Sequence, residues 1–149
     1  MARRSRAREV ALQALYTRDQ NRSLSAEDAL AFLGRRLLDS ELLALAKTLY
    51  LGTLEHLKDI DARLARVAEN WSVERMAVID RNVLRLGIYE LFHGPSTPFK
   101  VVLDEAIELA KRYGTEESPA FVNGILDRIA NEKNAAETPS SDSPPTPNP

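Results

Sequence analysis

The sequence predicts an all-α fold, a compact helical bundle of about seven helices followed by a disordered C-terminal tail. Three observations lead to this prediction. Apolar residues recur at intervals of three and four almost throughout residues 4–132, which is the period of a helix with one buried face. No stretch alternates apolar and polar residues between turn signals, as a half-buried strand would. With 149 residues, 44% of them hydrophobic, the chain is long enough to bury one core.

The N-terminal half predicts three or four helices. The spacing over residues 7–15 predicts the first helix, and the leucines of residues 30–37 predict a shorter second one. The same rhythm continues over residues 41–70. Gly52 and a nearby charged cluster interrupt that segment, so both one long helix and two shorter helices fit it.

Two further helices are separated by a loop. Residues 76–91 predict a helix with Ser72 as its N-cap, because serine side chains accept hydrogen bonds from the first free backbone N–H groups. The composition of residues 94–98, GPSTP, is typical of a loop. Residues 102–113 define the next helix, and Gly114 stands where a left-handed C-terminal cap belongs.

The last predicted helix begins at Ser118 as N-cap, has Pro119 at its first position and runs to about residue 129. From Asn134 onward, Pro, Ser and Thr fill 10 of 16 positions, and no aliphatic residue larger than alanine occurs. Such a segment buries too little surface to offset its ordering entropy. We therefore expect a folded domain over residues 1–133 and a disordered tail over residues 134–149.

The composition excludes several classes of protein and site. The chain has no cysteine, so it has no disulfide, thiolate nucleophile or cysteine-based metal site. We expect its two histidines, His56 and His93, to be exposed or satisfied structural residues. Without a phosphate loop, HExxH or GxSxG motif, we expect no catalytic residue, metal or cofactor. No apolar run suits a membrane span or a signal peptide, so we expect a cytoplasmic protein with no membrane partner.

The N-terminus is the sharpest charged feature. The first eight residues hold Arg3, Arg4, Arg6 and Arg8 and no acid, whereas the rest of the chain carries 16 basic and 22 acidic side chains. Arginine keeps its charge and offers a planar fork that matches phosphate, so a salt-sensitive attraction to RNA is one interpretation. The other interpretation is an N-terminus that only aids solubility, and the pattern alone does not choose between them.

Two aromatic residues and one helix also have two interpretations each. Tyr16 follows the arginines on the same helix and Phe121 lies near the start of the last helix, so each can stack on an unpaired base or pack in the core. The segment of residues 79–91 has more apolar surface than one narrow stripe needs. That helix is either central to the core, which the pattern favours, or shared with a partner.

Three blocks of the sequence resemble the NusB family of transcription antitermination factors. They are AVIDRNVLRLGIYEL at 77–91, PFKVVLDEAIELAKRYG at 98–114 and SPAFVNGILD at 118–127, and the arginine-rich start with ALQALY at 11–16 resembles the N-terminus of the family. The resemblance implies an all-α fold of two small sub-bundles without enzymatic activity. It implies binding of the boxA element of ribosomal RNA leader transcripts together with NusE, a small-subunit ribosomal protein. The pair would act on RNA polymerase with other Nus factors.

The resemblance also implies which residues form the sites. RNA contacts are expected from the N-terminal arginines and from the first and last helices: Arg3, Arg4, Arg6, Arg8, Gln13, Tyr16, Phe121 and Asn123. The partner surface is expected to include the helix that carries Asp80, Arg81, Arg85 and Glu90.

Two alternatives remain open at this point. One is a helical homodimer with a structural or storage role, whose arginines only aid solubility. The other is an RNA-binding module related to the N-terminal domains of ribosomal RNA methyltransferases, although no cofactor-binding βαβ unit follows in this sequence.

Overall fold

The computed structural model describes residues 3–69 and 71–142, and within them the regular structure is entirely helical. The α-helices are α1 (Arg3–Gln20), α2 (Ala26–Arg36), α3 (Ser40–Glu55), α4 (Leu57–Val67), α5 (Val78–Phe92), α6 (Phe99–Tyr113) and α7 (Ser118–Asp142), with one short 3-10 turn, η1 (Val73–Arg75). The predicted all-α fold of about seven helices is therefore confirmed for the described residues. None of these helices is long and apolar enough to cross a membrane.

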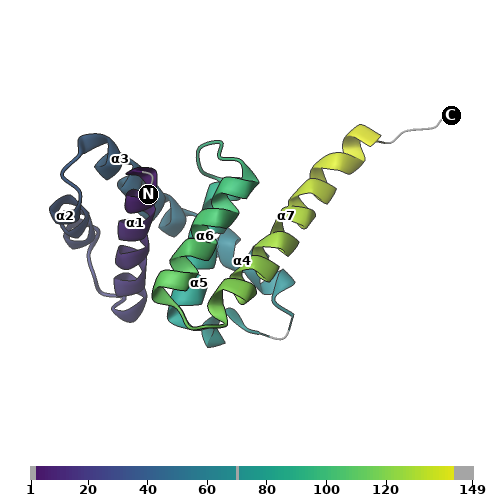
Figure 1. Cartoon of the computed structure of the whole chain (residues 1–149), viewed down its shortest axis with the longest axis horizontal. Coiled ribbons are helices and arrows are strands. Elements are labelled where there is room, and N and C mark those ends of the chain that lie inside the picture. Colours follow the sequence, from purple (N-terminus) through teal and green to yellow (C-terminus); the bar gives the residue numbers. More distant parts are fainter. Residues whose placement is uncertain (1–2, 70, 143–149) are drawn as a thin grey trace.

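The helices form two groups that share α5. Helices α1, α2 and α3 pack on one another, and α4, α6 and α7 pack with α5 (Figure 1). Helix α5 also contacts α1 and α3, so it joins the two groups. This arrangement explains why residues 82–90 of α5 are all buried, and it confirms the interpretation of that segment as central to the core.

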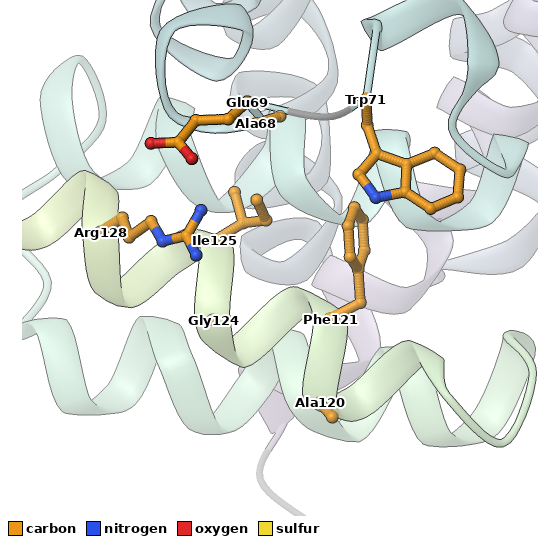
Figure 2. A pocket seen from close by; sticks show the side chains of 8 residues that line it. All are labelled: Ala68, Glu69, Trp71, Ala120, Phe121, Gly124, Ile125 and Arg128. Atoms are coloured by element: carbon orange, nitrogen blue, oxygen red, sulfur yellow. The ribbon is translucent and has the colours of Figure 1, made fainter.

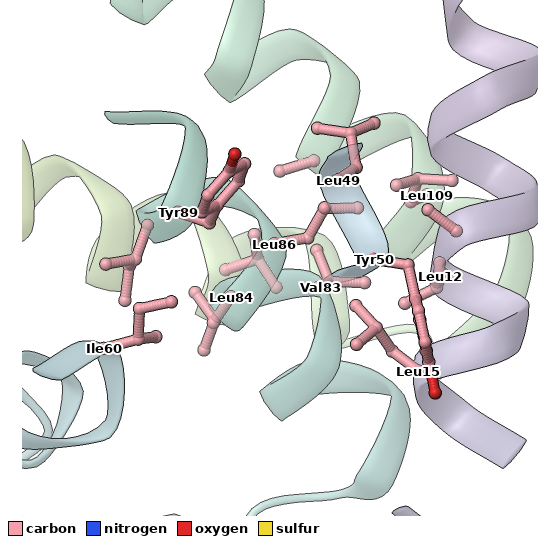
Figure 3. Packing of buried hydrophobic residues seen from close by; sticks show 14 of the residues in the cluster. Leu12, Leu15, Leu49, Tyr50, Ile60, Val83, Leu84, Leu86, Tyr89 and Leu109 are labelled. Atoms are coloured by element: carbon pink, nitrogen blue, oxygen red, sulfur yellow. The ribbon is translucent and has the colours of Figure 1, made fainter. Parts of the chain in front are cut away.

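One continuous apolar core runs through both groups. Leu12 of α1, Leu49 and Tyr50 of α3, and Leu84 and Leu86 of α5 are all at most 2% exposed and lie in the same cluster (Figure 3). Burying a leucine side chain contributes about 1.5–3 kcal/mol. The core therefore holds α1 firmly against α5, which matters because α1 carries the candidate RNA-binding residues.

Residues 41–70 form two helices that meet at His56. The backbone N–H of His56 still donates to the Gly52 carbonyl, while its own carbonyl accepts from Ile60, so the chain bends without losing either bond. The His56 ring stacks on His93 with centroids 3.8 Å apart, and His93 Nε2 lies 2.8 Å from Asp59 Oδ2. His93 thus has a hydrogen-bond partner, and His56 is a half-buried ring that stacks on it, which is compatible with the predicted structural roles.

Two predicted helix caps are wrong. Gly114 has a φ of −96°, outside the left-handed region, and a Cβ there would lie 2.4 Å from Ser118 Oγ. Glycine is therefore required at this position for close packing rather than for a left-handed turn. The Ser118 hydroxyl accepts from the backbone N–H of Thr115 at 2.9 Å, so it closes the preceding loop instead of capping α7.

One boundary also differs from the prediction. Ser72 precedes η1, makes no capping hydrogen bond, and is separated from α5 by the extended residues Met76 and Ala77. Helix α7 runs to Asp142, so it reaches into the segment for which the sequence predicts the tail. Helix propagation adds one hydrogen bond for each residue it orders, which allows α7 to extend beyond the core. Residues 143–149 of the predicted tail lie outside the described residues.

Candidate nucleic-acid interface

The predicted arginine arm is the first two turns of α1. Arg4 is exposed, and the side chain of Arg6 is 42% exposed. Arg3 begins the helix, but its side chain lies outside the described residues. Arg8 is only 3% exposed. Among the described side chains, the cationic surface at the start of α1 thus consists of Arg4 and Arg6.

Arg8 forms a buried ion pair with Glu90 of α5. Its Nε and Nη2 each donate to one carboxylate oxygen of Glu90 at 2.8 Å, and both side chains are 4% exposed. Burial disfavours the charge, but the bond to Glu90 and the charges of Glu90 and Glu105 raise the pKa of the Arg8 guanidinium. Arg8 and Glu90 therefore bond each other inside the protein, and the expected contacts of Arg8 with phosphate and of Glu90 with a partner protein stay predictions.

Glu9 is the centre of a hydrogen-bond network beside the exposed arginines. Its carboxylate accepts from Arg6 at 2.9 Å, from Arg112 of α6 at 2.8 Å and from the Tyr113 hydroxyl. Burial opposes ionisation, but the hydrogen bonds from Tyr113, Arg112 and Arg6 lower the pKa of Glu9 from 4.5 to about 2. Glu9 therefore stays ionised and fixes Arg6 and Arg112 side by side at the surface.

Gln13 and Tyr16 line a cleft of about 410 Å³ between α1, α2 and α6. The Gln13 amide donates to the Tyr113 hydroxyl at 2.9 Å, and its carbonyl accepts from Arg36 Nη1 at 3.1 Å. The guanidinium of Arg36 lies 4.7 Å from the centre of the Phe32 ring. Tyr16 is 38% exposed, so part of its side chain faces solvent at this cleft.

Phe121 lies at a second cleft, between α7 and the loop before η1. Its ring meets Trp71 edge to face, with centroids 6.1 Å apart, and packs against the core as well. Figure 2 shows Phe121 and Trp71 at one end of this 270 Å³ cleft, with Arg128 and Glu69 at the other. Trp71 is 52% exposed and Asn123 is exposed on α7. Both proposed roles of Phe121, packing and surface contact, are compatible with this position.

Asp80 lines another cavity, of about 380 Å³. Trp71 and Phe121 border this cavity as well, together with Arg75 and Met76. Asp80 Oδ1 is a buried acceptor without a hydrogen-bond partner in the described part of the chain. Of the four predicted partner residues, Asp80 is the one that lines a cavity and has an oxygen without a partner in the described part of the chain.

Arg81 and Arg85 belong to an internal network around Asp19. Arg81 and Asn82 hydrogen-bond Asp19 Oδ2 at 2.7 and 2.9 Å, and Arg85 lies 3.2 Å from the same oxygen. Arg85 also forms a two-pronged pair with Asp61, at 2.9 Å for both bonds. Burial opposes the charge of Asp19, but Arg81, Asn82 and Arg85 lower its pKa from 3.8 to about 2. The guanidinium groups of Arg81 and Arg85 thus tie α5 to α1 and α4, and their expected role in a partner surface stays a prediction.

Several residues at these surfaces escaped the sequence analysis. Arg36, Arg112 and Tyr113 belong to α2 and α6, and their contacts with α1 span 23 to 104 positions in sequence. The spacing of apolar residues within one helix gives no information about contacts between residues so far apart in the sequence. Trp71, the only tryptophan, could have been noticed as a large aromatic residue between two predicted helices. Within the described residues, no group of three or more His, Cys, Asp or Glu side chains could hold a metal ion.

The chain matches known proteins over most of its length. The NusB family matches residues 5–131. Transcription antitermination protein NusB of Sorangium cellulosum is 48% identical over 130 residues, which cover 87% of this chain and 93% of that protein. The same protein of Myxococcus xanthus is 44% identical over 136 residues and is covered to 96%. These relatives match almost end to end, so the methyltransferase-domain alternative is not supported.

Solved structures give the same result. NusB of T. maritima superposes with a TM-score of 0.80 and is 42% identical, with 88% of this chain and 92% of that chain covered. A chain from the complex of antitermination factors NusB and NusE with double-stranded RNA gives a TM-score of 0.79 at 28% identity, with 89% and 99% covered. On the combined strength of sequence, fold and helix order, this chain belongs to the NusB family.

Proposed function

We propose that the chain is a transcription antitermination factor that binds the boxA element of ribosomal RNA leader transcripts together with NusE. The assembly acts with RNA polymerase and other Nus factors to suppress premature termination. It works in the cytoplasm, where transcripts and ribosomal proteins are made in bacteria. The proposal involves binding alone and includes no chemical step.

The observation that carries this proposal is the position of Arg6 and Arg112, which come from different helices and are held together by Glu9. Two guanidinium groups on one surface attract phosphates without reading the sequence. Gln13 and Tyr16 lie about two and three turns beyond Arg6 on α1, where an amide and an aromatic ring can contact an unpaired base. The same helix therefore supplies both attraction and recognition.

NusE strengthens this binding because the protein alone has few free cations at the site. Arg8 is occupied by Glu90, so the start of α1 contributes less positive charge than its sequence suggests. A basic partner beside α1 enlarges the positive surface and raises the affinity for RNA. Asp80, which lines the cavity beside Trp71 and Phe121, is the candidate partner residue on α5.

A salt titration tests the RNA-binding surface. Fluorescently labelled boxA RNA and a scrambled strand are titrated with the protein, with and without NusE, at several salt concentrations. The double variant Arg4→Ala/Arg6→Ala should bind more weakly. Its log–log salt slope should be shallower by about 1.4, because each phosphate contact to a single strand contributes about 0.7.

The matched control is Lys58→Ala/Arg66→Ala, which also removes two exposed cations, but from α4. This variant should keep the salt slope of the wild type. Equal slopes for all three proteins would refute the role of the α1 arginines. Equal affinity of the wild type for boxA and scrambled RNA, with NusE present, would overturn the proposed function itself.

A further inference from the structure

We propose that the cleft between α1, α2 and α6 holds one unpaired base of the RNA, and that Arg36 of α2 is a contact residue for it. This inference rests on the proposed function and extends it to a helix outside the sequence blocks that indicate RNA binding. Besides Gln13 and Tyr16, the cleft is lined by Phe32, Arg36, Ile79 and Tyr113. Its volume of about 410 Å³ falls within the range of about 300–1,000 Å³ that small-ligand sites occupy.

The orientation of the Gln13 amide is determined by its neighbours. The Tyr113 hydroxyl uses its one proton to bond the Glu9 carboxylate, so its oxygen can only accept the Gln13 NH₂ group. The carbonyl oxygen of Gln13 is thereby turned toward Arg36, whose Nη1 donates to it at 3.1 Å. Glu9 acts through Tyr113 as a positioning residue for Gln13.

The result is a set of groups that suits a nucleobase. The Gln13 oxygen is an acceptor at the cleft, and the Arg36 guanidinium has donors beyond the one directed at Gln13. The stacking of Arg36 on Phe32 keeps the guanidinium plane in place. Tyr16, 38% exposed, supplies an aromatic face. Base edges carry donors and acceptors next to each other, and their flat faces stack on aromatic rings and guanidinium planes.

The surrounding charge favours an RNA occupant over a protein side chain. The Glu9–Tyr113 bond connects the floor of the cleft to the surface where Arg6 and Arg112 lie. On the other side, Arg35 is exposed next to Arg36 at the end of α2. A base in the cleft would therefore have cations on both sides, close to the phosphates that precede and follow it. Sites for single-stranded RNA combine base stacking with positive charge along the backbone.

The experiment compares Arg36→Ala with Arg35→Ala. Both variants remove one exposed charge from the last turn of α2, but Arg36 lines the cleft and Arg35 does not. A series of boxA RNAs, each with one abasic position, is titrated by fluorescence anisotropy with NusE present. We expect one position at which the abasic change weakens wild-type binding about tenfold, since stacking of one base contributes that much or more. The same change should weaken binding of Arg36→Ala less than about twofold, whereas Arg35→Ala should keep the wild-type profile.

The variant Glu9→Gln tests whether the orientation of the Gln13 amide matters for binding of the base. Loss of the carboxylate weakens the hold on Tyr113 and frees the Gln13 amide to rotate, so discrimination at the same abasic position should fall while other positions keep their effects. Identical abasic profiles for Arg36→Ala and Arg35→Ala would overturn the cleft assignment. That outcome is separate from failure of the proposed function, in which the wild type itself would not prefer boxA to scrambled RNA.

Discussion

Replacing Arg8 by alanine separates a structural arginine from an RNA-binding one. Arg8 and Glu90 are each 4% exposed and share two hydrogen bonds of 2.8 Å. Arg8→Ala leaves the Glu90 carboxylate buried without its counter-ion, and Glu105, whose Oε1 lies 3.9 Å from Arg8, adds a second negative charge nearby. Breaking one side of a buried pair costs about 3–5 kcal/mol.

That loss is large for a domain of this size. The free energy of unfolding of a folded domain is about 5–15 kcal/mol. Each kcal/mol moves the Tm by about 2–4 °C for a chain of about 150 residues, so Arg8→Ala should lower the Tm by about 6–20 °C. Arg6→Ala is the matched control, because Arg6 lies two positions away with a side chain that is 42% exposed. Without Arg6, Glu9 still accepts from Arg112 and Tyr113, so no buried charge is left unpaired and Arg6→Ala should melt close to the wild type.

Urea unfolding followed by far-ultraviolet circular dichroism measures both variants at pH 7. The double variant Arg8→Met/Glu90→Leu should recover most of the stability, because a buried ion pair can be replaced by apolar groups of similar volume. The reasoning would be refuted if Arg8→Ala changed the free energy of unfolding by less than about 1 kcal/mol while weakening RNA binding as much as Arg6→Ala. In that case Arg8 would be a phosphate contact.

Three further predictions concern other parts of the structure. Gly52→Ala places a Cβ 2.4 Å from the ring of Tyr89, so α3 and α5 must move apart. Urea unfolding should show a free energy of unfolding that is lower by about 1–3 kcal/mol. An unchanged urea midpoint would mean that this movement has no energetic cost. Asp19 has a pKa of about 2 in the folded protein, below its ordinary 3.8, so its stabilisation is complete above about pH 4 and is lost as the pH falls toward 2. Asp19→Asn should therefore reduce stability at pH 7 more than at pH 2.5, and an equal reduction at both values would contradict this. Trp71 is the only tryptophan and lies edge to face with Phe121, so saturating boxA RNA should change its fluorescence, whereas constant emission would place the RNA away from Phe121.

The helices could be predicted because apolar residues recur at helical spacing within each of them. The period of three and four residues appears within a single segment and needs no knowledge of the partner helix. The sequence could not decide between one helix and two over residues 41–70. Gly52 lies inside α3, where its missing side chain makes room for Tyr89, and the chain breaks at His56 instead. A glycine that serves packing and a glycine that ends a helix look the same in the sequence.

The site was harder to predict because charge alone does not tell surface from interior. Arg8 and Arg85 look like exposed cations in the sequence, but their partners Glu90 and Asp61 lie 82 and 24 positions away. Such pairs form only after the helices have packed. Arg4 and Arg6, which stand next to Arg8 in the sequence, remain at the surface. Composition could therefore indicate a basic N-terminus but not which arginines are free.

The distance of Glu90 from Arg8 along the chain has a consequence during synthesis. A ribosome adding about 5–20 residues per second needs about 4–16 s to make the 82 residues that separate the two. Throughout that interval the guanidinium of Arg8 lacks the partner that it has in the folded protein. The nascent protein therefore carries one more available arginine than the finished one, and completion of α5 withdraws it into the interior.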